Sequence, residues 1–163
     1  MKNAFLNEFE TRQKLAEFIS RNNKLSMGEE CYRFEKEFAQ LQGCKEAVLV
    51  NSGGSANLAI FQTLKNLGKL KDGDRVGFSA LTWSTNVMPI IQLGLVPVPI
   101  DCDPTTLNVM STQFEERLES TDIKALFITN VLGFAGDLGE IKKICDKKSI
   151  IFLEDNCEAL GSE

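Results

Sequence analysis

A glycine-rich turn with two serines has the residue types that bind an anion. Ser52, Gly53, Gly54 and Ser55 follow a short apolar run at residues 47–50 and precede a helical pattern. Glycines let backbone N–H groups approach a ligand closely, and the N-terminus of the following helix attracts negative charge. The turn therefore predicts a phosphate site, although it lacks the lysine of a Walker motif. The alternative is an ordinary turn between a strand and a helix, in which a serine caps the helix.

Two further segments carry side chains that suit an aromatic ligand. Trp83, the only tryptophan, stands among hydroxyl-bearing residues after an apolar run, where its ring could stack on an aromatic cofactor. Asp155 closely follows the apolar run at residues 150–153, and a carboxylate there could pair with a protonated pyridine nitrogen. The alternatives are a tryptophan that packs in the core and an aspartate that caps another helix.

These three segments together predict one ligand. A phosphate, a flat ring and a ring nitrogen that needs a carboxylate describe pyridoxal 5′-phosphate or pyridoxamine 5′-phosphate. The chain contains no histidine, which excludes a Ser-His-Asp triad and a histidine-ligated metal within these residues. The cysteines form no C-x-x-C pair, so we expect no metal site and no disulfide scaffold, only small buried thiols in a reducing cytosol. They are Cys31, Cys44, Cys102, Cys145 and Cys157.

The elements that must position these residues alternate between apolar runs and helical patterns. Apolar runs predict strands at 47–50, 75–79, 96–100, 125–129 and 150–153. Helical patterns occupy 8–20, 55–67, 84–93, 111–120 and 138–147, and a further helix should open at Ser26 and run through about Gln42. Ser26 and Glu29 predict a capping box for the second helix, and Pro97 and Pro99 place their strand at an edge. The alternation predicts an α/β fold, a three-layer α/β/α arrangement around a mainly parallel sheet. Ligands of such sheets bind at the carboxyl ends of the strands, where the three segments should meet.

Composition and charge narrow the class of protein further. The chain has 163 residues, of which 43% are hydrophobic and 25% are charged, as in a globular domain. The net charge is −5 and no more than two basic residues are adjacent, so we expect no nucleic-acid partner. No stretch of about 18 apolar residues occurs, and the charged N-terminus is unlike a signal peptide. We therefore expect a cytoplasmic protein without a membrane partner.

The chain resembles the N-terminal part of the DegT/DnrJ/EryC1/StrS sugar aminotransferases over nearly its whole length. The matching stretches are Ser26-Met27-Gly28, residues 34–39, Asn51-Ser52-Gly53-Gly54-Ser55-Ala56, Thr82-Trp83-Ser84-Thr85, residues 103–108 and Leu153-Glu154-Asp155. The resemblance implies the aspartate-aminotransferase fold type, also called PLP fold type I. Residues 1–163 would form an incomplete large domain that binds the cofactor, with a helical segment at 1–45 and the C-terminal domain absent.

The resemblance also implies roles for single residues. Gly53, Gly54 and Ser55, next to Ser52, would hold the phosphate. Trp83 would stack on the ring, and Asp155 would pair with the pyridine nitrogen. Most of the family has a glutamine that contacts the ring hydroxyl where this chain has Glu158.

Glu158, Thr82-Trp83-Ser84-Thr85 and Asn130-Val131-Leu132-Gly133 look more like the 4-keto-6-deoxyhexose 3-dehydratase branch. That branch removes the C3 hydroxyl of a sugar and has a histidine in place of the Schiff-base lysine. The deciding lysine or histidine would lie beyond Glu163, so we predict no catalytic residue in this chain and no amine transfer by the chain alone.

The resemblance implies an enzyme for nucleotide-linked 4-keto-6-deoxy sugars in deoxysugar and O-antigen biosynthesis. The 3-dehydratase type is favoured, and a sugar aminotransferase is the alternative within the class. The alternative from another class is a non-enzymatic α/β module that binds phosphate. The expected partners are a nucleotide-sugar substrate, an amino donor such as glutamate, and a second copy of the chain, because the apolar strand at 150–153 would otherwise remain exposed.

Overall fold

The computed structural model describes residues 7–162, and the chain divides between Leu49 and Val50 into two compact units. The N-terminal unit contains the helices α1 (Glu8–Arg21) and α2 (Glu29–Leu41), both stabilised by ion pairs between successive turns. The predicted capping box is wrong. Gly28 takes the N-cap position, so Glu29 is the first residue of α2 rather than the third and cannot reach back to Ser26.

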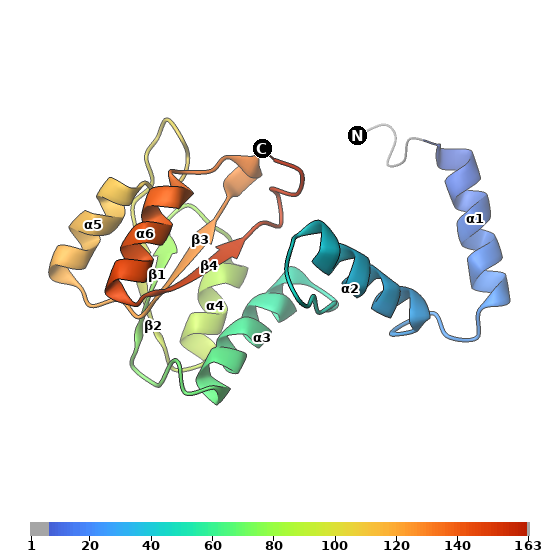
Figure 1. Ribbon diagram of the computed structural model, residues 1–163, viewed down its shortest axis with the longest axis horizontal. Helices are drawn as coiled ribbons and strands as arrows, with labels where there is room; N and C mark the ends of the chain where they lie inside the picture. Colours follow the sequence, from blue (N-terminus) through green and yellow to red (C-terminus); the bar gives the residue numbers. More distant parts are fainter. Residues whose placement is uncertain (1–6, 163) are drawn as a thin grey trace. The chain divides into compact units, whose positions relative to one another are not determined.

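The larger unit is built on a four-stranded parallel sheet in the order β2-β1-β3-β4 (Figure 1). The strands are β1 (Arg75–Ser79), β2 (Val96–Ile100), β3 (Ala125–Thr129) and β4 (Ile151–Asp155). The edge position of β2 is confirmed, since Pro97 and Pro99 lack the N–H groups that an inner strand needs.

The predicted strand at 47–50 is wrong. These residues are irregular, and the N–H of Leu49 donates to the Glu35 carboxylate at 2.7 Å instead of to a neighbouring strand. Val48 is also 81% exposed. A short apolar run becomes a strand only where another strand offers its backbone, and here a side chain supplies the hydrogen bond.

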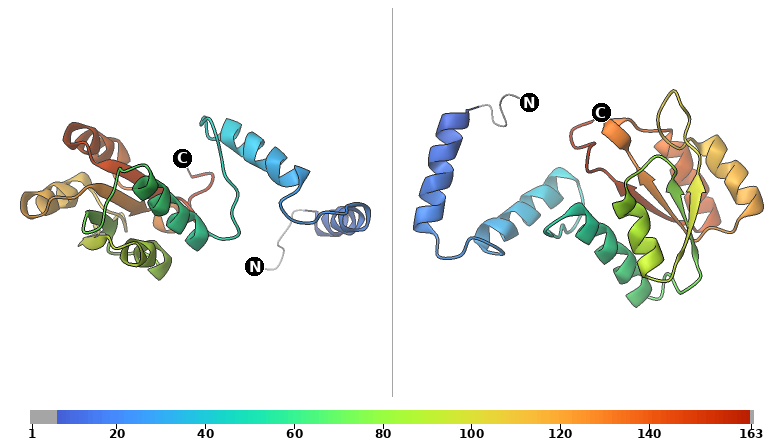
Figure 2. Two further views of the ribbon diagram at one scale, coloured as in Figure 1. Left: turned by 90° about the horizontal axis from the view of Figure 1, so that it is seen from below. Right: turned by 180° about the vertical axis from the view of Figure 1, so that it is seen from behind.

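Helices cover both faces of the sheet, which confirms the three-layer α/β/α arrangement (Figures 1 and 2). On one face lie α3 (Gly53–Asn66) and α4 (Ser84–Gln92), and on the other lie α5 (Ser111–Ser120) and α6 (Leu138–Lys148). A short 3-10 helix, η1 (Val131–Gly133), follows β3. Each helix connects two parallel strands, or leads into one, so every strand points its carboxyl end to the same edge of the sheet.

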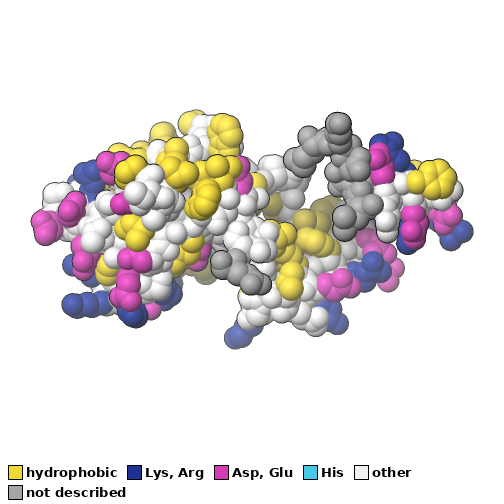
Figure 3. Space-filling model, turned by 90° about the horizontal axis from the view of Figure 1, so that it is seen from above, with side chains coloured by type: hydrophobic (Ala, Val, Ile, Leu, Met, Phe, Trp, Pro, Cys, Tyr) yellow, Lys and Arg dark blue, Asp and Glu magenta, His cyan; other side chains and the backbone are white. Residues whose placement is uncertain are grey.

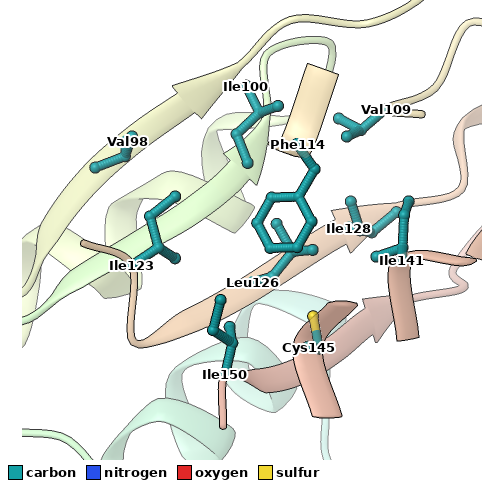
Figure 4. Packing of buried hydrophobic residues seen from close by; sticks show 10 residues of the cluster. All are labelled: Val98, Ile100, Val109, Phe114, Ile123, Leu126, Ile128, Ile141, Cys145 and Ile150. Carbon is teal, nitrogen blue, oxygen red and sulfur yellow. The ribbon is translucent and has the colours of Figure 1, made fainter. Parts of the chain in front are cut away.

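Two apolar cores hold these layers together. The core beneath α5 and α6 gathers side chains from these two helices and from the sheet around Phe114 and Leu126 (Figure 4). The core beneath α3 and α4 is centred on Phe61 and Phe127, whose rings meet edge to face at 5.4 Å. All five residues of β3 are buried, as expected for an inner strand of a parallel sheet. By contrast, β4 lies at the sheet edge and is only partly buried.

The surface carries no large basic area on the face seen in Figure 3, where Lys and Arg alternate with Asp and Glu. Between residues 7 and 162, no helix has both the length and the apolarity needed to cross a membrane. The expectation of buried cysteines holds only for Cys145. Cys44 and Cys157 are exposed because they lie in turns that follow α2 and β4, and Cys31 and Cys102 are partly exposed.

We predict that Gly77→Ala destabilises the larger unit by about 1–3 kcal/mol. Gly77 is an inner residue of β1, and an added Cβ would lie 2.9 Å from Ile100 Cδ1 and 3.2 Å from Ile123 Cδ1. Urea unfolding followed by circular dichroism measures the change. Gly139→Ala in α6 is the matched control, because its Cβ meets nothing within 4 Å. Equal stability of the two variants would contradict the close packing of β1.

We also predict a loss of stability in alkali that depends on Cys145. Burial raises the pKa of this thiol from 9.0 to about 11, and the nearby Asp146 adds to the effect. The unfolded chain therefore loses the thiol proton first, so stability should fall as the pH rises from about 9 to 11. Urea midpoints across this range should fall less steeply in Cys145→Ala than in the wild type. The control Cys44→Ala, at an exposed thiol, should keep the wild-type slope.

Candidate functional site

A cavity of about 360 Å³ opens at the carboxyl ends of the strands. Four of the seven predicted site residues line it: Gly53, Trp83, Asp155 and Glu158. The other three, Ser52, Gly54 and Ser55, belong to the same helix start as Gly53. Residues from the three predicted segments thus meet in one place, at the sheet edge where a parallel topology predicts a ligand.

The glycine-rich turn forms the start of α3 and contains its serine cap, whereas its phosphate-binding role stays a prediction. Ser52 is the N-cap, and its hydroxyl oxygen accepts a hydrogen bond from the N–H of Ser55 at 3.2 Å. The N–H groups of Gly53 and Gly54 are the first two of the helix and have no partner within it. The turn is open, since a Cβ at Gly53 would meet nothing within 4 Å. The cap uses one N–H group and leaves two for an anion.

Asp155 is the last residue of β4, and its carboxylate accepts three hydrogen bonds. Oδ2 accepts from Nδ2 of Asn86 at 2.7 Å and from Nδ2 of Asn57 at 3.2 Å, and Oδ1 accepts from the N–H of Cys157 at 3.0 Å. The alternative of a helix cap does not apply, because the residues that follow up to 162 form turns and no helix. The carboxylate is therefore held by donors from three segments and lies in the cavity wall.

Asn57 and Asn86 were not predicted as site residues. Both are buried, at 5% and 2% exposure, and both line the cavity. The sequence does contain a signal for them. Each amide stands one turn before a fully buried apolar residue on the same helix, Phe61 in α3 and Ile90 in α4. An amide on the apolar stripe of a helix needs a buried hydrogen-bond partner, and that partner is Asp155.

Trp83 is the N-cap residue of α4 and is 71% exposed. The alternative of a tryptophan packed in the core is therefore wrong, because the start of α4 directs the ring away from the apolar cores. Leu81 and Leu132 also line the cavity and are exposed, so this part of the wall offers apolar surface to a flat ligand.

Glu158 lies in the turn after β4, and its Oε2 accepts a hydrogen bond from the N–H of Leu132 at 2.8 Å. Leu132 is the central residue of η1 and has a φ of 54°, in the left-handed region. The carboxylate thus ties two segments of the cavity wall together. Its predicted contact with a ring hydroxyl stays a prediction.

The charges of the cavity are unbalanced. Its lining includes the carboxylates of Asp155 and Glu158 but no lysine or arginine. An anion in this cavity would therefore depend on the free N–H groups and the dipole of α3. In residues 7–162 no group of three or more Cys, Asp or Glu side chains could hold a metal ion.

Comparison with known proteins places these features in a family. The profile of the DegT/DnrJ/EryC1/StrS aminotransferase family matches residues 7–163. The GDP-4-keto-6-deoxy-D-mannose 3-dehydratase of Yersinia pseudotuberculosis is 39% identical over 145 residues, which are 86% of this chain and 36% of that protein. The enzyme of the same name from Escherichia coli O55:H7 is 37% identical over 153 residues, 91% of this chain and 39% of that protein.

A solved structure agrees with these relatives. The crystal structure of GDP-4-keto-6-deoxymannose-3-dehydratase with a trapped PLP-glutamate geminal diamine superposes with a TM-score of 0.82 at 34% identity. The match covers 98% of this chain and 41% of that one. The chain therefore spans about two fifths of the length of the proteins that it matches.

We predict that Ser52→Ala lowers the free energy of unfolding by about 1 kcal/mol, because the cap of α3 is lost. Ser55→Ala is the matched control. It removes only an exposed hydroxyl that accepts from Ser52, and the N–H of residue 55 keeps its bond to the cap. Chemical unfolding of both variants measures the difference. An equal loss in both would show that Ser52 does not cap the helix.

Proposed function

The chain belongs to the DegT/DnrJ/EryC1/StrS aminotransferase family, and on that premise we propose that its cavity binds pyridoxal 5′-phosphate or pyridoxamine 5′-phosphate. One observation carries the proposal. The Asp155 carboxylate, the ring of Trp83 and the open start of α3 line the same cavity. These groups match the nitrogen, the ring and the phosphate of the cofactor.

The donor set supports this assignment group by group. Gly53 and Gly54 would bind the phosphate through N–H groups that have no partner within α3. Trp83 would cover one face of the ring and exclude water from it. Asp155 would hold a proton on the pyridine nitrogen through a charge-assisted hydrogen bond. When bound, the cofactor supplies an electron sink for bond breaking next to its amine.

We propose a nucleotide-linked 4-keto-6-deoxy sugar as the substrate and loss of its C3 hydroxyl as the reaction. The 37–39% identity to two GDP-4-keto-6-deoxy-D-mannose 3-dehydratases supports this type. Glu158, at the position where aminotransferases of the family are expected to have glutamine, also supports it. On the same premise, glutamate is the proposed amino donor and a second copy of the chain is the proposed partner.

The proposal predicts that pyridoxamine 5′-phosphate quenches the fluorescence of Trp83, the only tryptophan. Pyridoxamine 5′-phosphate is the better probe, because the aldehyde of pyridoxal 5′-phosphate also reacts with surface lysines. Asp155→Asn should raise the dissociation constant at least about tenfold, the loss expected for a hydrogen bond to a charged group.

Asp146→Asn is the matched control, because Asp146 is exposed on α6 and pairs with Lys142 outside the cavity. It should leave the dissociation constant unchanged. Inorganic phosphate should compete only weakly. Binding of phosphate as tight as that of the cofactor would favour a phosphate-binding module, and the absence of quenching at millimolar cofactor would reject the proposal.

A further inference from the structure

The two buried asparagines beside Asp155 use all of their N–H groups. Nδ2 of Asn86 donates to Asp155 Oδ2 at 2.7 Å and to Thr129 Oγ1 at 3.1 Å. Nδ2 of Asn57 donates to Asp155 Oδ2 at 3.2 Å and to the carbonyl oxygen of Thr85 at 3.3 Å. Each amide nitrogen has only two hydrogens, so neither asparagine has a donor left for another partner.

These positions would otherwise suit apolar residues. Both lie on helix stripes that bury Phe61 and Ile90 in the core beneath α3 and α4. Burial of a polar amide is costly unless it is hydrogen-bonded, and a leucine would fill such a position without that requirement. Two such amides donate to the same carboxylate oxygen. We therefore attribute their presence to the hydrogen bonds with Asp155 rather than to packing of the core.

The two amides also determine which oxygen of Asp155 remains available. A carboxylate oxygen has two lone-pair positions, and Oδ2 receives two N–H donors. Oδ1 receives only the N–H of Cys157. The two amides therefore occupy Oδ2 and leave one acceptor position on Oδ1.

We propose that Asn57 and Asn86 are positioning residues that fix the orientation of the Asp155 carboxylate and present Oδ1 to the ring nitrogen of the cofactor. The inference rests on the proposed function, which supplies that ring nitrogen. A separate bond connects Asn86 to the other ring contact, because its backbone N–H donates to the carbonyl oxygen of Trp83 at 3.0 Å.

A double-mutant cycle tests this role. Pyridoxamine 5′-phosphate affinity is measured by Trp83 fluorescence for the wild type, Asn86→Ala, Asp155→Asn and the double variant. If Asn86 acts through Asp155, Asn86→Ala raises the dissociation constant about tenfold in the wild type and less than about twofold in the Asp155→Asn background. The same factor in both backgrounds would overturn the inference, since it would mean that Asn86 only supports the fold.

Thermal unfolding shows whether Asn86→Ala folds. If it does not, a second double-mutant cycle with Asn57→Ala in its place tests the same role. Gln62→Ala is the matched control, because Gln62 is an exposed amide on α3 that bonds only to Asn66. It should leave affinity unchanged in both backgrounds. If the wild-type chain does not bind the cofactor, the proposed function itself is rejected. If the chain binds but each asparagine variant changes affinity by the same factor in both backgrounds, only the role of the asparagines is rejected.

Discussion

The carboxylate of Asp155 is the group on which the rest of the site depends. A partly buried charge at the end of a strand is costly unless several donors meet it. The structure brings donors from α3, α4 and the turn after β4 to this one side chain. Those donors occupy one oxygen fully and the other in part. The need to satisfy one charge therefore determines which residues of two helices must be amides.

At the start of α3, the proposed ligand group is itself negative and needs donors from the protein. A phosphate needs positive potential, yet the cavity lining includes no lysine or arginine. Two N–H groups and the helix dipole remain after Ser52 has capped the helix. The serine cap is therefore compatible with the proposed phosphate site, because it leaves the first two N–H groups of the helix unused.

Asp155 and the start of α3 lie at the same edge of the parallel sheet. The inner strand β3 is buried along its whole length, and apolar cores on both faces hold α3 and α4 in place. Trp83, as the N-cap of α4, keeps its ring on the surface of the cavity. Trp83 and the Asp155 carboxylate are thus positioned by the same packing.

The sequence by itself determined the order of helices and strands, the edge position of β2 and three of the segments that meet in the cavity. These follow from local periodicity, proline chemistry and the rule for parallel sheets, which need no knowledge of distant contacts. Only the tertiary structure showed that residues 47–50 are not a strand and that Asn57 and Asn86 bind Asp155. These asparagines are 98 and 69 residues away from it along the chain. The partner of a buried amide depends on how helices pack on the sheet, and no local pattern contains that information.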